Sequence, residues 1–271
     1  MSDPSTVARQ TNEHVQGQTQ VTQDYLKVIV SAEEWGDGGI SVSDLAARMG
    51  VVASTASENV RRLTEAGLVD HRPYQKVHLT RRGREVAVAM VRRHRILETY
   101  LFEKLDFDWD EVHREAEVLE HAISDTLLEH LDRALGYPFR DPHGDPIPAI
   151  DGTWFAPPKR SLDDLPVGDH AVVVRISDAS SDMLRDLEGR GIVLDAVVRV
   201  EARSHALGTT RLRVTPPPGW HVRGAAPSSE SDGGFPAQGP TEVELGTVAT
   251  SAIFVGLGEG PEEPTLSGRV G

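Results

Sequence analysis

The fold is decided by residues 41–80, which read SVSDLAARMGVVASTASENVRRLTEAGLVDHRPYQKVHLT. A serine before an apolar-spaced segment and a glycine after it predict a short helix over 41–50. A second helix is predicted over 54–66, ended by Gly67. Two short apolar runs, 68–70 and 77–80, flank an Arg-Pro-Tyr turn and predict a β-hairpin. Helix, turn, helix and hairpin, in this order, are the elements of a winged helix-turn-helix.

Longer helices are predicted on both sides of this unit. Apolar spacing predicts a first helix over 21–35 and a long one over 81–105. A further helix is predicted over 110–135, where six apolar residues form one stripe: Val112, Ala116, Leu119, Ile123, Leu127 and Leu131. Such a stripe suits either a core or a subunit interface.

The composition changes after Gly136, where Pro, Gly and Asp accumulate and predict a linker. From His170 onward, apolar runs predict strands over 171–176, 193–202, 209–214, 241–248 and 252–255, with one helix around 181–188. Several short strands separated by turns are typical of a small β-barrel. Residues 216–240 are of low complexity and predict a mobile loop.

The bulk composition limits the class of protein. A length of 271 residues favours two or three domains. The polar N-terminus does not resemble a signal peptide, and no apolar run approaches the ~20 residues of a membrane span, so we expect a cytoplasmic protein with no membrane partner. The absence of cysteine excludes disulfides, thiolate metal sites and cysteine nucleophiles.

The net charge of −14 conceals an uneven distribution. Residues 54–95 hold 10 Lys and Arg against 4 Asp and Glu, whereas residues 103–133 hold 3 against 11. A basic block followed directly by an acidic block favours two partners, a polyanion and a cation. Ordinary solvated helix faces would produce the same counts, so charge alone leaves both interpretations open.

The acidic block contains the segment HREAEVLEH at residues 113–121. Four of its side chains share one face of a helix: His113, Glu117, Glu120 and His121. On the preceding helix His94 and Glu98 are four residues apart and also share a face. Carboxylates and imidazoles that converge on a rigid backbone predict a divalent-cation site, with a solvated polar face as the alternative. Oxygen and imidazole ligands suit Mn(II) or Fe(II).

A hydrolase is a rival interpretation of the same segment. Glu117-x-x-Glu120-His121 is one residue away from the H-x-x-E-H signature of a class of zinc peptidases. That chemistry requires a histidine where Glu117 stands. We therefore expect no enzyme.

The second helix of the pair suits DNA recognition. It begins with small hydroxyl residues, which allow its N-terminus to approach the major groove closely: Ser54, Thr55 and Ser57. Four basic residues would contact phosphates: Arg61, Arg62, Arg72 and Lys76. Glu58 would either accept a hydrogen bond from a cytosine or orient an arginine. A helical hairpin used for protein contact is the alternative.

Together these segments resemble the diphtheria toxin repressor family of metal-dependent transcriptional repressors, most closely its manganese-responsive branch. The resemblance covers nearly all of residues 20–150. It is carried by TQDYLKVI (22–29), VASTASENVRRL (52–63), GLVDH (67–71), AMVRRHRILETYL (89–101), DEVHREAEVLEHAISD (110–125) and DPHGDPIP (141–148).

The resemblance implies two metal sites. The primary site falls on Asp24, Glu117, Glu120 and His121, and the ancillary site on His94, Glu98 and His113. Iron-responsive members have methionine and cysteine in place of Asp24 and Glu117, so this chain favours Mn(II) as co-repressor, with Fe(II) as the alternative.

Two departures from the family stand out. Manganese-type members with a binuclear site have a glutamate at the position of Lys27, which argues against a two-metal cluster here. Ser180 and Met183 stand where the barrel of three-domain members supplies ancillary ligands, so that contribution is missing or shifted to Asp178 or Asp182.

The resemblance also implies a fold that is mainly α with β. The expected parts are a disordered arm (1–19), a winged helix-turn-helix DNA-binding domain (20–82), a helical metal-binding and dimerisation domain (83–140), a linker (141–167), an SH3-like, FeoA-like small β-barrel (168–258) with the mobile loop 216–240, and a tail (259–271). The implied function is a Mn(II)-dependent homodimeric repressor that binds palindromic operator DNA, expected to control metal-uptake genes such as those of manganese transport. An Fe(II)-dependent repressor of iron-uptake genes and a metal-independent winged-helix regulator are the alternatives.

Overall fold

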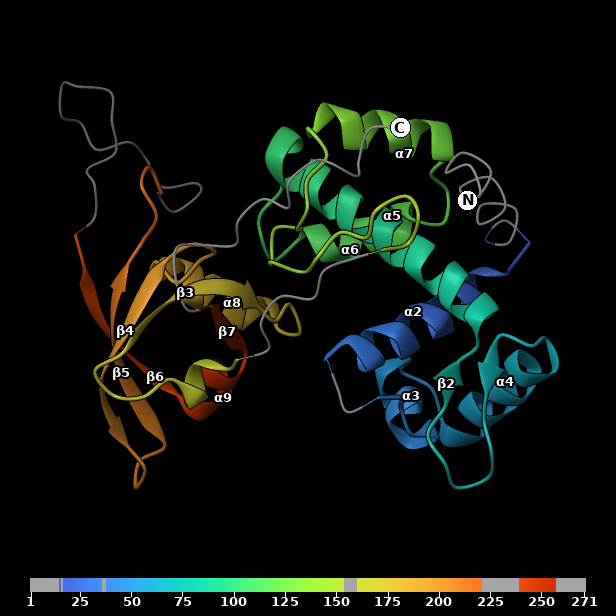
Figure 1. The fold of residues 1–271 in the computed structure, drawn as a ribbon, viewed down its shortest axis with the longest axis horizontal. Helices are drawn as coiled ribbons and strands as arrows, with labels where there is room; N and C mark the ends of the chain where they lie inside the picture. The colour runs from blue at the N-terminus through green and yellow to red at the C-terminus, as the bar shows by residue number, and fades with distance from the viewer. Residues whose placement is uncertain (1–14, 16, 36–37, 154–159, 221–238, 257–271) are drawn as a thin grey trace.

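The computed structural model describes residues 15, 17–35, 38–153, 160–220 and 239–256. Figure 1 shows three units along the chain: helices α2 to α4 with a small hairpin, a helical unit built on α5, and a β-sheet. The expected arm (1–19), the mobile loop (216–240) and the tail (259–271) lie largely or wholly outside the described residues. No described helix combines the length and the apolar character needed to cross a bilayer.

The first unit is the predicted winged helix-turn-helix. It consists of α2 (Gln20–Trp35), α3 (Val42–Arg48), α4 (Ala53–Glu65), β1 (Val69–Asp70) and β2 (His78–Leu79). The Ser41 side chain accepts a hydrogen bond from the Asp44 amide and so caps α3. β1 and β2 pair antiparallel, and an isolated bridge between Ile40 and Val77 extends the wing. Tyr25, Leu26 and Ile29 of α2 are buried in the core of this unit.

Helix α5 (Arg81–Leu105) joins the first unit to the second, as Figure 1 shows, and its bounds are those predicted. The Thr80 side chain caps its first turn by accepting from the Gly83 amide. A Cβ at Gly83 would lie 1.9 Å from the Leu68 carbonyl oxygen, so this position requires glycine for α5 to pack against the wing. The helix therefore links the wing, which packs against its start, to two of the metal-ligand candidates, His94 and Glu98.

The prediction of a single helix over 110–135 is wrong. The chain forms α6 (Val112–Leu119) and α7 (Asp125–Ala134), with a turn between them. Ser124 caps α7 by accepting from the Leu127 amide, and a serine cap of this kind favours a new start over continuation. The apolar stripe is accordingly interrupted: Val112 is buried, whereas Leu127 is 51% exposed.

The third unit is an antiparallel sheet of five strands in the order β6-β5-β4-β3-β7. Its elements are η1 (Leu162–Asp164), β3 (His170–Ile176), α8 (Ser181–Gly189), β4 (Val197–Ser204), β5 (Thr209–Thr215), β6 (Thr241–Gly246), α9 (Thr247–Ser251) and β7 (Ile253–Gly256). Alternate residues of β5 are buried, as expected of a sheet with one face on a core.

Residues 141–148, which composition assigned to the linker, are packed between the second and third units. Asp141, His143, Asp145 and Ile147 are all buried. The Ile176 amide of β3 donates to the His143 carbonyl oxygen at 2.8 Å. Since Pro, Gly and Asp mark turns without revealing burial, the sequence pattern did not indicate this packing.

Candidate metal centre and DNA-reading surface

Three of the four residues expected at the primary metal site lie together. One ligand atom each of Asp24, Glu120 and His121 falls within 4.8 Å of the others. His121 Nε2 is 3.0 Å from Asp24 Oδ1 and 3.6 Å from Glu120 Oε1. Asp24 comes from α2, whereas Glu120 and His121 come from the turn after α6, so the break in the predicted helix forms this cluster.

Gln23 orients His121, and sequence reasoning missed this residue. The Gln23 Nε2 group donates to the carbonyl oxygens of Val15 and Gln18, which fixes its amide so that Oε1 accepts from His121 Nδ1 at 2.7 Å. His121 Nε2 is then the nitrogen left to bind a metal ion, and it faces Asp24 and Glu120. Metal-binding histidines are typically oriented in this way through their second nitrogen. A lone glutamine on a helix carries no sequence signal for the role.

Glu117, the fourth expected ligand, lies beside this cluster and is not part of it. Its side chain is 51% exposed, and Oε1 is 3.5 Å from His113 Nε2 and 3.8 Å from Lys27 Nζ. The hydrogen bond from His113 lowers the pKa of Glu117 to about 2. Lys27 also donates to Glu120 Oε1 at 2.6 Å. The ammonium group therefore sits between two carboxylates, where its charge disfavours the second ion of a two-metal cluster.

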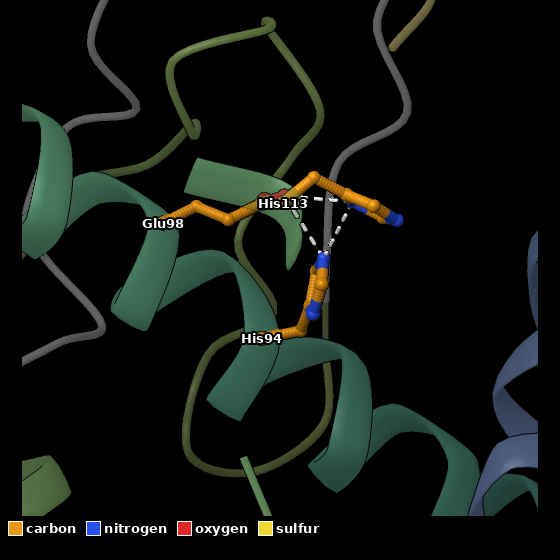
Figure 2. Close-up of side chains that lie close together, drawn as sticks. All are labelled: His94, Glu98 and His113. Atoms are coloured by element: carbon orange, nitrogen blue, oxygen red, sulfur yellow. Dashed lines mark hydrogen bonds and ion pairs between the residues drawn. The ribbon is translucent and has the colours of Figure 1, made fainter. Parts of the chain in front are cut away.

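The ancillary residues His94, Glu98 and His113 form a second cluster, drawn in Figure 2. Glu98 Oε1 is 2.9 Å from His94 Nε2 and 3.1 Å from His113 Nδ1. His94 and Glu98 project from α5 and His113 from α6, as the sequence spacing predicts. Glu98 is 2% exposed in its side chain, so both imidazoles converge on a buried carboxylate.

His94 connects the two clusters. Its Nδ1 lies 2.6 Å from Glu120 Oε2, while its Nε2 faces Glu98. Burial would lower the pKa of His94, but the charge of Glu98 and the hydrogen bond to Glu120 outweigh it and raise that pKa. Burial would raise the pKa of Glu120, but the hydrogen bond and charge of His94 lower it. Glu120 is thus already surrounded by positive or proton-donating groups.

The sheet unit contributes Asp178 to the ancillary cluster. Asp178 Oδ2 lies 3.2 Å from His113 Nδ1, whereas Asp182 pairs with Arg185 and Ser180 caps α8. Of the two positions considered from the sequence, the geometry favours Asp178. Burial would lower the pKa of His113, but hydrogen bonds to Glu117 and Glu98, with the charges of Glu98 and Asp178, raise it to about 11.

The residues expected to contact DNA lie on α4 and the wing. Seven are exposed: Ser54, Thr55, Ser57, Arg61, Arg62, Arg72 and Lys76. Glu58 lies 2.8 Å from an Arg61 nitrogen and 3.1 Å from an Arg62 nitrogen, which matches the expectation that it orients an arginine. The hydrogen bond from Arg61 lowers the pKa of Glu58 to about 2. Tyr74, fully exposed at the tip of the wing, adds an aromatic side chain to this surface.

A winged helix-turn-helix joined to carboxylate–imidazole clusters defines a class of metal-dependent DNA-binding regulators. The model of the iron-dependent repressor N-terminal DNA-binding domain matches residues 18–77, and that of the iron-dependent repressor metal-binding and dimerisation domain matches 80–149. A FeoA domain matches 160–215. These matches follow the order of the three units.

Relatives and solved structures agree with this class. The iron-dependent repressor IdeR of Mycobacterium tuberculosis is 32% identical over 192 residues, which cover 66% of this chain and 83% of the relative. The diphtheria toxin repressor of Corynebacterium diphtheriae is 31% identical over 183 residues, covering 66% of this chain and 74% of the relative. A solved manganese-dependent transcriptional repressor in complex with manganese is 47% identical, with a TM-score of 0.74. The match covers 86% of this chain and 98% of the solved chain.

The chain belongs to the iron-dependent repressor family, which includes the diphtheria toxin repressor. It is a DNA-binding transcriptional repressor of that family. The predicted family and the predicted fold class, with its winged helix-turn-helix, helical unit and FeoA-type domain, are confirmed.

Proposed function

We propose that Mn(II) is the co-repressor of this protein and that Asp24, Glu120 and His121 bind it. The observation that carries the proposal is their convergence from α2 and the α6–α7 turn, with the His121 ring oriented by Gln23 so that Nε2 faces the two carboxylates. The set offers oxygen and imidazole and no sulfur, which suits Mn(II) over softer ions. The similar solved repressor described in complex with manganese supports the choice. A turn of the exposed Glu117 side chain would supply a fourth ligand.

The proposed mechanism is a shift between two arrangements of the reading unit. A divalent cation supplies positive charge shared by ligands from two units. Asp24 moves with α2 and therefore with α4, whereas Glu120 and His121 belong to the helical unit. The ion favours the arrangement that binds DNA only to the extent that it binds this arrangement more tightly than the arrangement that does not bind DNA. His94, Glu98 and His113, joined by Asp178, would bind a second ion that holds the sheet unit close.

The wild-type protein tests this proposal directly. A duplex operator selected from random DNA in the presence of Mn(II) is labelled, and binding is measured by fluorescence anisotropy in Mn(II) and in chelator. We expect tight binding with Mn(II) and weak binding in chelator. Equal binding in both would identify a metal-independent regulator. Competition between Mn(II) and Fe(II), repeated on an Asp24→Met/Glu117→Cys double variant, distinguishes the iron-dependent alternative, because soft ligands should shift preference toward Fe(II).

We further propose that the protein acts as a homodimer on palindromic operators. Three apolar side chains of α6 and α7 are exposed in a single chain: Val118, Leu119 and Leu127. Contiguous exposed apolar surface commonly marks a protein interface. A two-fold dimer would present two copies of α4 to a palindrome, one per half-site.

Charges placed on this surface should disrupt the dimer. In a Val118→Asp/Leu127→Asp variant we expect a monomer by light scattering coupled to size exclusion, because buried unpaired carboxylates are costly. Val248→Asp, at an 81% exposed residue of α9, is the matched control and should leave the wild-type mass unchanged. A dimer that persists in the double variant would place the interface elsewhere.

For the DNA surface we propose that Ser54, Thr55 and Ser57 approach the bases while Arg61, Arg62, Arg72 and Lys76 contact phosphates. Glu58 would keep the two helical arginines in place until DNA replaces it as their partner. We propose that this repressor works in the cytoplasm on genes of metal uptake, without catalytic activity of its own.

A further inference from the structure

A third cluster of potential ligands lies outside the two sites already described. One ring nitrogen of His143 and one carboxylate oxygen each of Glu98 and Asp141 fall within 4.8 Å of one another. The three residues are 1%, 1% and 4% exposed, respectively. Glu98 comes from α5, and the other two come from the packed 141–148 segment. The sequence pattern gave no indication of this cluster because the segment has the composition of a linker.

His143 is held with one nitrogen free. Its Nε2 lies 3.1 Å from the Trp109 carbonyl oxygen, and since a carbonyl only accepts, Nε2 carries the proton. Nδ1 therefore keeps a lone pair, and this buried atom has no hydrogen-bond partner among the described residues. The ring also stacks on Trp109, with centroids 5.5 Å apart. An imidazole fixed through one nitrogen with the other free is the usual arrangement of a metal ligand.

The charges around the cluster do not balance. Three buried carboxylates, those of Glu34, Asp141 and Asp145, lie within 4 Å of the Arg95 guanidinium group, and Asp145 also pairs with Arg175. Glu98 pairs with His94 and His113, so these three carboxylates face only two guanidinium groups. Unpaired buried charge is costly, so a bound cation would stabilise this region.

We propose that Glu98, Asp141 and His143 form an additional divalent-cation site, with His143 Nδ1 as its nitrogen ligand and Mn(II) as its expected occupant. Cations that bind oxygen at about 2.1–2.5 Å keep their ligands within about 5 Å of one another, which the cluster satisfies. Asp141 and Trp109 also line an open cavity of about 300 Å³ beside the cluster. The inference relies on the proposed function only in sharing Glu98 with the ancillary site.

This site would fasten the sheet unit to α5. Within the 141–148 segment, Asp145 Oδ1 accepts from Arg175 Nε of β3 at 2.8 Å, and the His143 carbonyl accepts from Ile176. An ion between Glu98 and His143 would therefore join α5 to the segment that holds β3. Its expected role is to fix the position of Asp178 beside His113.

The first test uses the wild-type chain. Crystals grown in Mn(II) are measured for anomalous scattering, and we expect a peak between Glu98, Asp141 and His143, separate from those at the primary and ancillary clusters. Peaks at the other two clusters with none here would overturn the proposal. This measurement does not depend on any variant folding.

The second test counts ions per subunit by native mass spectrometry in Mn(II). His143→Gln should bind one ion fewer than the wild type, and Glu98→Gln two fewer, because Glu98 serves two sites. Asp24→Ala is the matched control and should lose only the primary ion. An unchanged ion count in a folded His143→Gln variant would refute the site. Because His143→Gln retains Asp24, Glu120 and His121, its operator binding should still depend on Mn(II). A wild type that binds DNA equally in chelator would refute the proposed function alone.

Discussion

Replacing Arg95 with alanine is expected to destabilise the metal-free protein by about 3–5 kcal/mol, the usual cost of breaking a buried ion pair. Arg95 is 7% exposed in its side chain and donates to Glu34 Oε2 at 2.8 Å and to the Pro146 carbonyl oxygen at 2.6 Å. It also lies 3.5 Å from Asp145 Oδ1. Without the guanidinium group, these buried carboxylates would lose a counter-ion at the junction of α2, α5 and the 141–148 segment.

The loss of stability in the Arg95→Ala variant should depend on pH in a defined direction. Burial already raises the pKa of Glu34, although the charge of Arg95 and its hydrogen bonds lower it, and removing Arg95 would raise this pKa further. A carboxyl whose pKa is higher in the folded than in the unfolded state makes folding less favourable as pH rises. The destabilisation of Arg95→Ala relative to the wild type should therefore be larger at pH 8 than near pH 5.

Urea unfolding followed by circular dichroism, in chelator at both pH values, measures this effect. Arg81→Ala is the matched control on the same helix, because Arg81 is 95% exposed and its pair with Glu85 is a surface ion pair, worth about 0–1 kcal/mol. Arg95→Lys should fall between the two, since it keeps the charge but not the planar pair of donors. If Arg95→Ala were as stable as Arg81→Ala, the buried cluster would not be held by this ion pair.

Helices whose ends and apolar face are both marked in the local sequence were predictable. α5 has the predicted bounds because its apolar spacing continues over residues 81–105 and the Thr80 side chain caps its start. The helix over 110–135 was wrong because periodicity continues across the turn, while the cap at Ser124 is a single residue within it. Local periodicity describes which face is apolar and is a weaker guide to where a helix ends.

In the metal clusters, ligands on one helix could be predicted from the sequence, whereas contacts between distant elements could not. Residues at helical spacing, such as His94 and Glu98, could be grouped from the sequence because α5 places them on one face. Asp24 could be joined to Glu120 and His121 only through the family resemblance, since spacing within one helix says nothing about contacts between α2 and a distant turn. Gln23 and His143 carry no local pattern, and their roles follow from tertiary hydrogen bonds alone.

Asp24→Ala is expected to weaken Mn(II)-dependent operator binding by about 100-fold or more, because even outer-shell partners of a metal site commonly contribute 10–100-fold. Asp24 is the member of the primary cluster that belongs to α2, whereas Glu120 and His121 come from one turn of the helical unit. An ion bound only to that turn would no longer connect the reading unit to the helical unit. Mn(II) should then still bind elsewhere in the protein without activating it.

This separation of metal binding from DNA binding is what distinguishes a bridging ligand from an ordinary one. Operator anisotropy across a Mn(II) titration gives the activation, and calorimetry gives the number of ions bound outside the primary cluster, which should be unchanged. Asp24 is 35% exposed in its side chain, so the variant should fold, and Asp186→Asn on α8, with a 55% exposed carboxylate, is the matched control. If Asp24→Ala binds the operator in Mn(II) as tightly as the wild type does, the ion acts within the helical unit and reaches the reading unit by another route. Helix α5 would then be the element to examine, because it carries His94 and Glu98 and packs against α2.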